Sequence, residues 1–192
     1  MKFVCLISGG IDSAVAVYLS ALKGHEITLL HMKVGEFNIK PIVERLRAVT
    51  KQKLPLYEVD HTTFLKHIIK QCDRRYTCIL CKRRMYREAE LLCKQLKADG
   101  IVTGENLAQV ASQTLENLYV LSKAVNVPVL RPLIGYNKEE IVGIAKKIGT
   151  YELQDRKPCP YAPRKPKTKS TEEEVLAEEQ MITFPLEPPQ QI

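Results

Sequence analysis

The sequence predicts an α/β fold built on a doubly wound parallel sheet, with helices on both faces. Short runs that are almost entirely apolar, such as residues 2–7, are typical of central parallel strands covered on both sides. These runs alternate with segments of helical periodicity, and the alternation occurs three times within the first 70 residues. A glycine turn between the first strand and the first helix completes the pattern.

The length of 192 residues is enough to bury a core, and one α/β domain is the ordinary outcome for it. The composition changes near residue 160, beyond which prolines and basic residues become frequent. We therefore expect one domain over residues 1–160. A basic and proline-rich tail over 161–192 would follow, with a short acidic helix inside it.

Five apolar runs are short and are bounded by turn residues, as strands are. They are residues 2–7, 27–32, 56–59, 101–103 and 127–130. Between them, apolar residues recur three and four positions apart, which is the helical period. These helical segments are residues 14–22, 41–53, 62–69, 85–96 and 109–121.

The ends of the helices carry recognisable signals. Gly24 suits a helix C-terminus, Pro41 suits a first turn, and Thr62 or Thr63 can cap the third helix. Two further helices are expected to start with capping boxes, one pairing Asn137 with Glu140 and one pairing Thr171 with Glu174. They run to Lys147, before Gly149, and to Gln180; the proline-rich end, 184–192, is expected to dock loosely or to fray.

The net charge of +7 and a pI near 9.1 favour a polyanionic partner. Nucleic acid is favoured over an acidic membrane because the basic residues are dispersed along the chain. No apolar run is long enough to span a bilayer, and the chain starts directly in a strand pattern. These features predict a cytoplasmic protein without a membrane partner. Its six cysteines are then core, catalytic or metal-ligating residues, and Cys5 and Cys93 are expected in the core.

Residues 8–13, with the sequence S-G-G-I-D-S, predict a phosphate-binding turn. Gly9 and Gly10 lack a Cβ, so the backbone can approach a ligand closely. Its N–H groups would then face an oxyanion at the positive end of the following helix. Ser8 and Ser13 add hydroxyl donors.

Asp12 would repel a phosphate, so its presence indicates Mg²⁺ or a chemical role. The turn matches neither the Walker pattern nor the dinucleotide-binding glycine pattern. It resembles the PP-loop of ATP pyrophosphatases, which adenylate a carbonyl oxygen and release pyrophosphate. Strand ends are the other place where ligands bind in such sheets. Backbone atoms at His31 and Met32 could read an adenine edge there, and Gln109, Ser112 and Gln113 are expected to face the same crevice.

Motifs in a fixed order resemble the catalytic domain of the ThiI-type tRNA sulfurtransferases, the 4-thiouridine synthetases, over residues 3–159. They are V-T-G-E-N-L-A-Q-V-A-S-Q-T-L at 102–115, S-G-G-I-D-S at 8–13, Lys82-Arg83, R-P-L-I-G at 131–135 and I-G-T-Y-E at 148–152. The resemblance implies an adenine nucleotide α-hydrolase fold with five parallel strands in the order 3-2-1-4-5. It also implies that ATP is held at Leu6, Ile7, His31, Met32, Lys82, Gly104 and Gln113. Asp12, Lys138 and Cys159 match the residues on which the family's chemistry depends.

The implied reaction is ATP-dependent thiolation of a tRNA uridine. Adenylation makes uracil O4 a leaving group that sulfur can displace. Amides of Gly9 and Gly10, Mg²⁺ and Lys82 would stabilise the departing pyrophosphate, and Lys138 would neutralise the α-phosphate or the activated base. Two alternatives stay open: sulfur transfer to a small molecule on a thiamine-related path, and a nucleotide-binding module without turnover.

Sulfur delivery is expected to involve Cys78, Cys81 and Cys159. Two cysteines on one helical turn and a distant third resemble the iron–sulfur-dependent tRNA thiolases, in which a 3Fe-4S or 4Fe-4S cluster binds sulfide. Zinc with Cys72 as a fourth ligand, and a redox-active or persulfide-carrying thiol set, are the alternatives. We expect no rhodanese-like extension to hold a persulfide, so the sulfur donor is expected to be sulfide or a persulfide carrier protein.

The resemblance also implies a tRNA partner; fuller relatives carry an RNA-binding domain before the catalytic domain, whereas the first strand is expected here at Lys2. RNA is then expected on a basic surface, or on a separate RNA-binding protein. The basic residues are Arg74, Arg75, Arg83, Arg84, Arg87 and those of segment 156–169. A homodimer is compatible with this arrangement.

Overall fold

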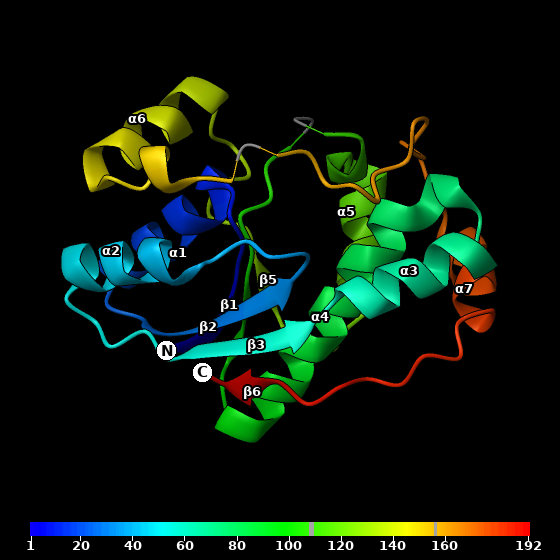
Figure 1. Ribbon diagram of the computed structural model, residues 1–192, viewed down its shortest axis with the longest axis horizontal. Coiled ribbons are helices and arrows are strands. Elements are labelled where there is room, and N and C mark those ends of the chain that lie inside the picture. Colours follow the sequence, from blue (N-terminus) through cyan, green and yellow to red (C-terminus); the bar gives the residue numbers. More distant parts are fainter. Residues whose placement is uncertain (108–109, 156) are drawn as a thin grey trace.

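The computed structural model describes residues 1–107, 110–155 and 157–192. Within them, one sheet has the strand order β5-β4-β1-β2-β3-β6 (Figure 1). The strands are β1 (Lys2–Ile7), β2 (Glu26–Lys33), β3 (Leu56–Asp60), β4 (Gly100–Val102), β5 (Val129–Leu130) and β6 (Gln190–Gln191). The first five are parallel, which confirms the expected doubly wound sheet and its order 3-2-1-4-5.

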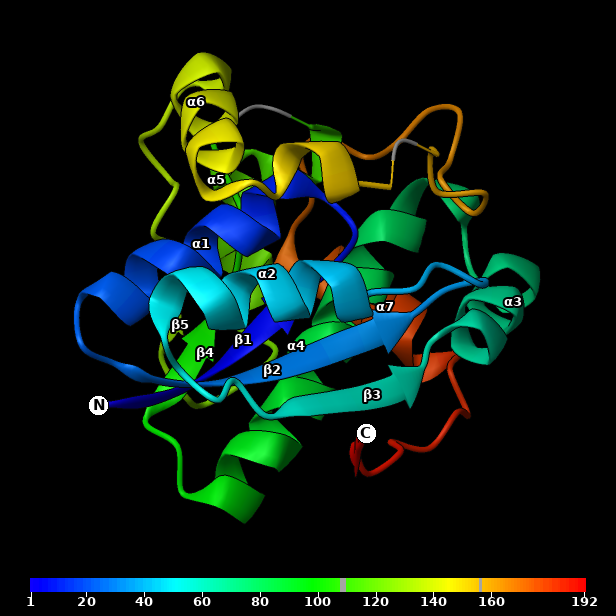
Figure 2. The same cartoon turned by 60° about the vertical axis from the view of Figure 1, so that its left-hand side comes forward.

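Helices cover both faces of the sheet (Figures 1 and 2). On one face lie α1 (Ile11–Leu22), α2 (Lys40–Thr50) and α6 (Lys138–Ile148). On the other lie α3 (Thr62–Gln71), α4 (Thr77–Leu96), α5 (Leu115–Ser122) and α7 (Glu172–Gln180). No helix in these residues has the length and apolar character needed to cross a membrane.

Strand β1 shows why the central runs are apolar at every position. Phe3 and Cys5 point into the core under α1 and α2, whereas Val4 and Leu6 point into the core under α3 and α4. A strand covered on both faces has no solvent-facing side, so it carries no alternating polar residues. This arrangement places the loop after β1 at the middle of the sheet.

Most helix boundaries follow the expected signals. Both capping boxes form, at Asn137 with Glu140 and at Thr171 with Glu174. Gly149 ends α6 in the left-handed region, with φ of +75°. The expected cap of α3 was wrong, because neither threonine side chain caps it. Instead Asp60 accepts bonds from the Thr62 N–H at 3.0 Å and the Thr63 hydroxyl at 2.7 Å.

The helix expected over 109–121 is shorter than predicted. A 3₁₀ turn covers Ala111–Gln113, and α5 starts only at Leu115, where the Thr114 side chain accepts a bond from the Asn117 N–H. Gln109 lies outside the described residues, as does Arg156 at the start of the expected basic segment.

The C-terminal segment is held in place, so the expectation that it docks loosely or frays was wrong. Strand β6 pairs antiparallel with the edge strand β3, and the Ile192 N–H donates to the Leu56 carbonyl at 3.0 Å. Upstream, the Phe184 ring packs beside Phe64 with ring centroids 5.7 Å apart. The tail therefore extends the sheet and covers α3 and α4.

Two arginines expected on an RNA-binding surface are buried under this tail. Arg83 is 1% exposed, and its guanidinium donates to both carboxylate oxygens of Glu179 at 2.8 and 3.0 Å. Arg84 is 5% exposed, pairs with Glu88 at 2.7 Å and donates to the Phe184 carbonyl at 3.0 Å. Their assignment to the RNA surface was wrong: their charges are satisfied inside the protein and hold the tail.

Candidate functional site

The loop between β1 and α1 is shaped by its two serines. The Ser8 N–H donates to Ser13 Oγ at 3.0 Å, and the Gly10 N–H donates to Ser8 Oγ at 3.2 Å. Ser13 Oγ also lies 3.2 and 3.1 Å from the carbonyl oxygens of Ser8 and Gly10. The serines thus fix the turn. Gly10 is the N-cap of α1 and offers no side-chain cap, so this helix end keeps N–H groups for an anion.

Two glycines are required by close packing around this loop. A Cβ on Gly104 would lie 2.6 Å from the backbone nitrogen of Ser13. A Cβ on Gly9 would lie 2.7 Å from Cβ of Asp155 and 2.9 Å from the Phe37 ring. The Asp155 N–H donates to the Gly9 carbonyl at 2.8 Å. The end of β4 and the segment after Tyr151–Leu153 are therefore both pressed against the loop.

An open cavity of about 210 Å³ lies at the carboxyl ends of β1 and β4. It brings together most of the residues predicted to bind nucleotide. They are Leu6, Ile7, Ser8, Gly10, Ser13, Lys82, Gly104 and Gln113, and the predicted catalytic residue Asp12 lies with them. Four further residues complete the lining: Met85, Tyr86, Thr103 and Glu105. A cavity in this place is where open α/β sheets bind their ligands.

The two residues predicted to act on the phosphate side form an ion pair. Lys138 Nζ lies 2.7 Å from Asp12 Oδ1. Asp12 belongs to the first turn of α1, and Lys138 is the first residue of α6. Helix packing between α1 and α6 thus joins residues 126 positions apart at the cavity.

His31 and Met32 lie behind the cavity lining and are buried. His31 Nδ1 lies 3.0 Å from the Ile7 carbonyl, which it donates to in the tautomer that carries a proton there. Burial lowers the pKa of this imidazole, so it stays neutral near pH 7. The ring ties β2 to β1, and contact of His31 and Met32 with a nucleotide stays a prediction, because neither residue lines the cavity.

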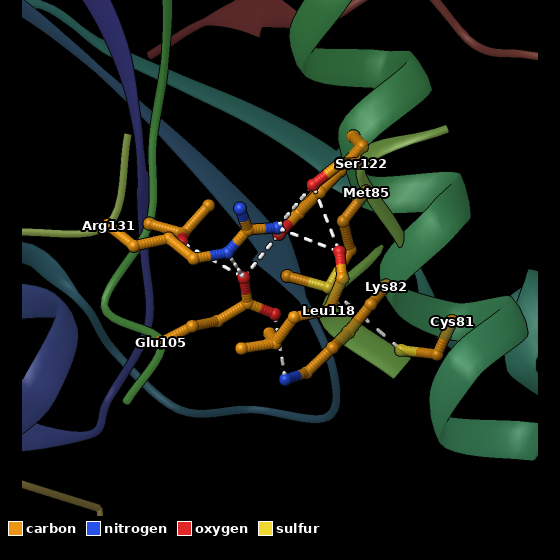
Figure 3. A network of polar contacts seen from close by, with 9 residues as sticks. Cys81, Lys82, Met85, Glu105, Leu118, Ser122 and Arg131 are labelled. Atoms are coloured by element: carbon orange, nitrogen blue, oxygen red, sulfur yellow. Dashed lines mark hydrogen bonds and ion pairs between the residues drawn. The ribbon is translucent and has the colours of Figure 1, made fainter. Parts of the chain in front are cut away.

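Glu105 is the centre of a polar network that sequence reasoning missed (Figure 3). One oxygen, Oε1, accepts a bond from Lys82 Nζ at 3.0 Å. The other, Oε2, accepts bonds from Arg131 Nε at 2.8 Å, Thr103 Oγ1 at 3.1 Å and the Tyr86 hydroxyl. The available signals were the place of Glu105 directly after a strand end and of Arg131 at the head of R-P-L-I-G.

The charges in this network keep Glu105 ionised. Burial alone would raise the pKa of its carboxyl group, but the cations Lys82 and Arg131 and the bond from Tyr86 outweigh it and lower the pKa. Arg131 has a raised pKa for the complementary reason. The cluster therefore contains one anion and two cations beside the cavity.

The paired thiols lie on α4, directly before Lys82. Cys78 and Cys81 are in the first turns of α4, and Cys81 Sγ lies 3.2 Å from His61 Nε2 and 4.0 Å from Met85 Sδ. Burial raises the pKa of Cys81 to about 12, with smaller contributions from Cys78 and Cys159. Cys159 is exposed, yet close enough to raise the pKa of Cys78 as well.

The three thiols are thus within electrostatic reach of one another. No three His, Cys, Asp or Glu side chains in the described ranges are arranged to hold a metal ion, so the three-thiolate site stays a prediction. Cys72 Sγ is directed to the Glu178 carbonyl at 3.6 Å, which turns it toward α7. Cys5 and Cys93 are buried in the core as expected.

The sheet order, the uncapped glycine turn and the cavity at the strand ends define the fold of the PP-loop ATP pyrophosphatases. Within that class, the chain belongs to the ThiI family, described as "Thiamine biosynthesis protein (ThiI)", which it matches over residues 1–184.

Comparison with individual proteins agrees with this membership. The "Probable tRNA sulfurtransferase" of Methanocaldococcus jannaschii is 48% identical over 185 residues, which cover 91% of this chain and 48% of that protein. The chain thus spans about half the length of the curated relatives it matches. The crystal structure of a 4-thiouridine synthetase in complex with RNA and bound ATP is 35% identical, with a TM-score of 0.84, over 94% of this chain and 50% of that one.

A more distant structure shares the fold. The U34-tRNA thiolase NcsA of Methanococcus maripaludis, solved with its [4Fe-4S] cluster, has a TM-score of 0.57 at 18% identity over 94% of this chain and 64% of that one.

Proposed function

We propose that this chain carries the ATP-dependent chemistry of tRNA uridine thiolation, which makes 4-thiouridine. The observation that carries the proposal is one cavity bordered by the uncapped start of α1, by the Asp12–Lys138 pair and by Lys82. The relatives named tRNA sulfurtransferase and the ATP-bound 4-thiouridine synthetase support it. ATP and tRNA are the substrates in this proposal.

In the first step, uracil O4 attacks the α-phosphorus of ATP. An O–P bond forms, the bond to the β-phosphate breaks, and pyrophosphate leaves with its electron pair. The amides at the start of α1 hold the leaving phosphates, while Lys82 and Lys138 offset the charge that develops there. In the second step, the sulfur of hydrosulfide (HS⁻) bonds to C4 of the base, the C4–O bond breaks, AMP departs with the electron pair of that bond, and the proton of the sulfide passes to solvent.

Asp12 fits a magnesium ion, because a half-buried carboxylate at the mouth of a phosphate site is the ligand this ion prefers. When bound, Mg²⁺ would neutralise the leaving phosphates. Lys138 then orients the same carboxylate from the other side.

The thiols of Cys78, Cys81 and Cys159 are proposed to hold an iron–sulfur cluster that supplies an iron with a free position for exogenous sulfide. All three are cysteines, whose thiolates are the usual ligands of such clusters, and the raised thiol pKa values of Cys78 and Cys81 mean that each would have to lose a proton when the cluster binds. His61 contacts Cys81 and fixes its orientation. A sulfide source or a persulfide carrier protein is the proposed donor.

RNA is proposed to bind the basic residues that remain exposed once Arg83 and Arg84 are removed from the set. These are Arg74, Arg75, Lys157, Arg164, Lys165 and Lys169. A separate RNA-binding protein or segment would add to this surface, and a cytoplasmic location suits the substrates.

Pyrophosphate release from ATP tests the proposal, measured anaerobically with tRNA and sulfide and followed by nucleoside analysis for 4-thiouridine. We expect both products, and we expect Asp12→Ala to abolish both. Pyrophosphate release at the same rate with and without tRNA, or an Asp12→Ala protein that remains active, would contradict the proposal.

The family's description as a thiamine biosynthesis protein favours one second candidate, thiolation of a small molecule. The two candidates differ in tRNA affinity. Phosphate contacts predict binding that weakens steeply as salt increases, whereas a small-molecule enzyme would show no tRNA binding even at low salt.

Iron, zinc and sulfide analysis of the anaerobic protein and of Cys159→Ser tests the proposed cluster. One zinc per chain and no iron would overturn it.

A further inference from the structure

Glu105 lies at the back of the nucleotide cavity, directly after Gly104 at the end of β4. It is 5% exposed. A buried carboxylate costs stability unless it is paired and hydrogen-bonded, and this one is bonded at both oxygens. No step of the proposed reaction uses it.

The two oxygens of Glu105 have different tasks. Oε2 is fixed by three donors that come from three parts of the chain: Tyr86 on α4, Thr103 after β4, and Arg131 after β5. Oε1 accepts only the bond from Lys82 among the contacts described. The protein therefore immobilises one oxygen and presents the other to a single lysine (Figure 3).

Arg131 is itself fixed, which makes the frame rigid. Its Nη2 donates to the Tyr86 hydroxyl and to Ser122 Oγ, both at 3.0 Å. The guanidinium thus spans from the Glu105 carboxylate to α5. A lysine side chain has four flexible carbons, so a fixed partner restricts the positions of its ammonium before a ligand binds.

The balance of charge leaves Lys82 available to a phosphate. Glu105 supplies one negative charge, which Arg131 alone would balance, so the surplus positive charge falls to Lys82 at the cavity lining. An ammonium has three donors, and the bond to Glu105 uses one of them. The remaining two can bond an anionic ligand without breaking the bond to Glu105.

We infer that Glu105 is a positioning residue that holds the Lys82 ammonium in the cavity for the phosphates of ATP. The inference rests on the proposed function, because it takes ATP to be the occupant of the cavity. It adds a residue that acts through Lys82 and that needs no contact with the nucleotide.

A double-mutant cycle on ATP affinity tests the inference, using Lys82→Ala, Glu105→Gln and the double variant. The folded state of each is checked by thermal melting. Each single variant should bind ATP about tenfold more weakly, since each removes a charge-assisted contact. The double variant should bind no more weakly than Lys82→Ala, because Glu105 has nothing left to position.

Two further variants guard against a general effect on folding. Glu90→Gln neutralises a second buried carboxylate, which lies on α4 and pairs with Lys94. It should leave ATP affinity unchanged. Tyr86→Phe removes one anchor of Oε2 and keeps the ring in the core. It should weaken ATP binding by about threefold, and only where Lys82 is present.

The inference is overturned by additive losses in the double variant, or by unchanged or tighter ATP binding in Glu105→Gln. Failure of the proposed function gives a different result. If the wild-type protein binds ATP and follows the cycle but makes no thiolated tRNA, the role of Glu105 holds and the function does not. If the wild-type protein binds no ATP, both are rejected.

Discussion

Lys138 Nζ lies 2.7 Å from Asp12 Oδ1, so the first residue of α6 is ion-paired with the first turn of α1 at the edge of the cavity. Half of the Lys138 side chain is exposed, and pairs of this kind contribute little to stability. The role of the Asp12–Lys138 pair is then to act on a ligand and not to stabilise the fold.

Neutralising either partner should therefore separate activity from stability. We expect Asp12→Asn and Lys138→Met each to change the free energy of unfolding by less than about 1 kcal/mol, while pyrophosphate release falls by at least about 100-fold. Urea unfolding and the release assay measure the two effects. Glu26→Gln, which breaks the exposed pair with Lys2, is the matched control and should change neither. A fall in activity that only follows a fall in stability would count against the assignment.

Glycine 104 should be irreplaceable for a steric reason. In Gly104→Ala the new Cβ meets backbone atoms of α1 at 2.6 Å, and backbone cannot rotate away as a side chain can. We expect a loss of about 2 kcal/mol in unfolding free energy together with loss of ATP binding, because α1 must move from the end of β4.

Gly143→Ala provides the contrast within the same protein. Nothing lies within 4 Å of a Cβ at Gly143, which is exposed in α6, so alanine should stabilise the helix by up to about 1 kcal/mol. Equal effects of the two substitutions, measured by urea unfolding, would refute the packing argument.

Arg83 and Arg74 lie close together in the sequence, but Arg83 is buried and Arg74 is exposed. Arg83→Met leaves Glu179 with only the half-buried Arg87, so we expect a loss of about 3 kcal/mol in unfolding free energy. Arg74→Met, at an exposed position, should leave stability unchanged and weaken tRNA binding at low salt. The reverse pattern in unfolding and binding assays would restore Arg83 to the RNA surface.

Protonation of His61 predicts a pH dependence of stability. Burial, followed by the charge of Arg84, lowers the pKa of His61 to about 4, compared with about 6.5 in the unfolded chain. Below pH 6.5 the unfolded state binds a proton that the folded state does not, so stability falls as the pH decreases from 6.5 towards 4. The loss should reach roughly 3 kcal/mol. Urea unfolding at several pH values measures it, and the slope should flatten in His61→Gln; an unchanged slope would show that another group is responsible.

The sequence was sufficient for the central sheet, because strands buried on both faces are apolar at every position and are set apart by turn residues. It was also sufficient for the glycine turn, which is marked by local sequence, whereas Leu6, Ile7, Lys82 and Gly104 in the cavity lining were indicated only by the resemblance to a known family. Whatever depends on distant partners could not be predicted in this way. Arg83 looks like a solvated charge until Glu179, 96 positions later, folds against it.

The same reason explains two other omissions. Strand β6 consists of Gln190 and Gln191, which have no strand pattern of their own and pair only because β3 offers a free edge. Glu105 belongs to the motif at residues 102–115, but its role in the network depends on Tyr86 and Arg131, which reach it from other elements.

The hydrogen bond from the Asp155 N–H to the Gly9 carbonyl limits how far Cys159 can lie from the glycine turn. Three residues separate Cys159 from Asp155, and a fully extended chain covers at most about 14 Å between the Cα atoms of these two residues. Whatever route the loop takes, the Cα of Cys159 cannot lie farther than this from the Cα of Asp155, whose N–H is bonded to the glycine turn. In the proposed reaction, this limit would keep the third cysteine of the cluster site near the glycine turn.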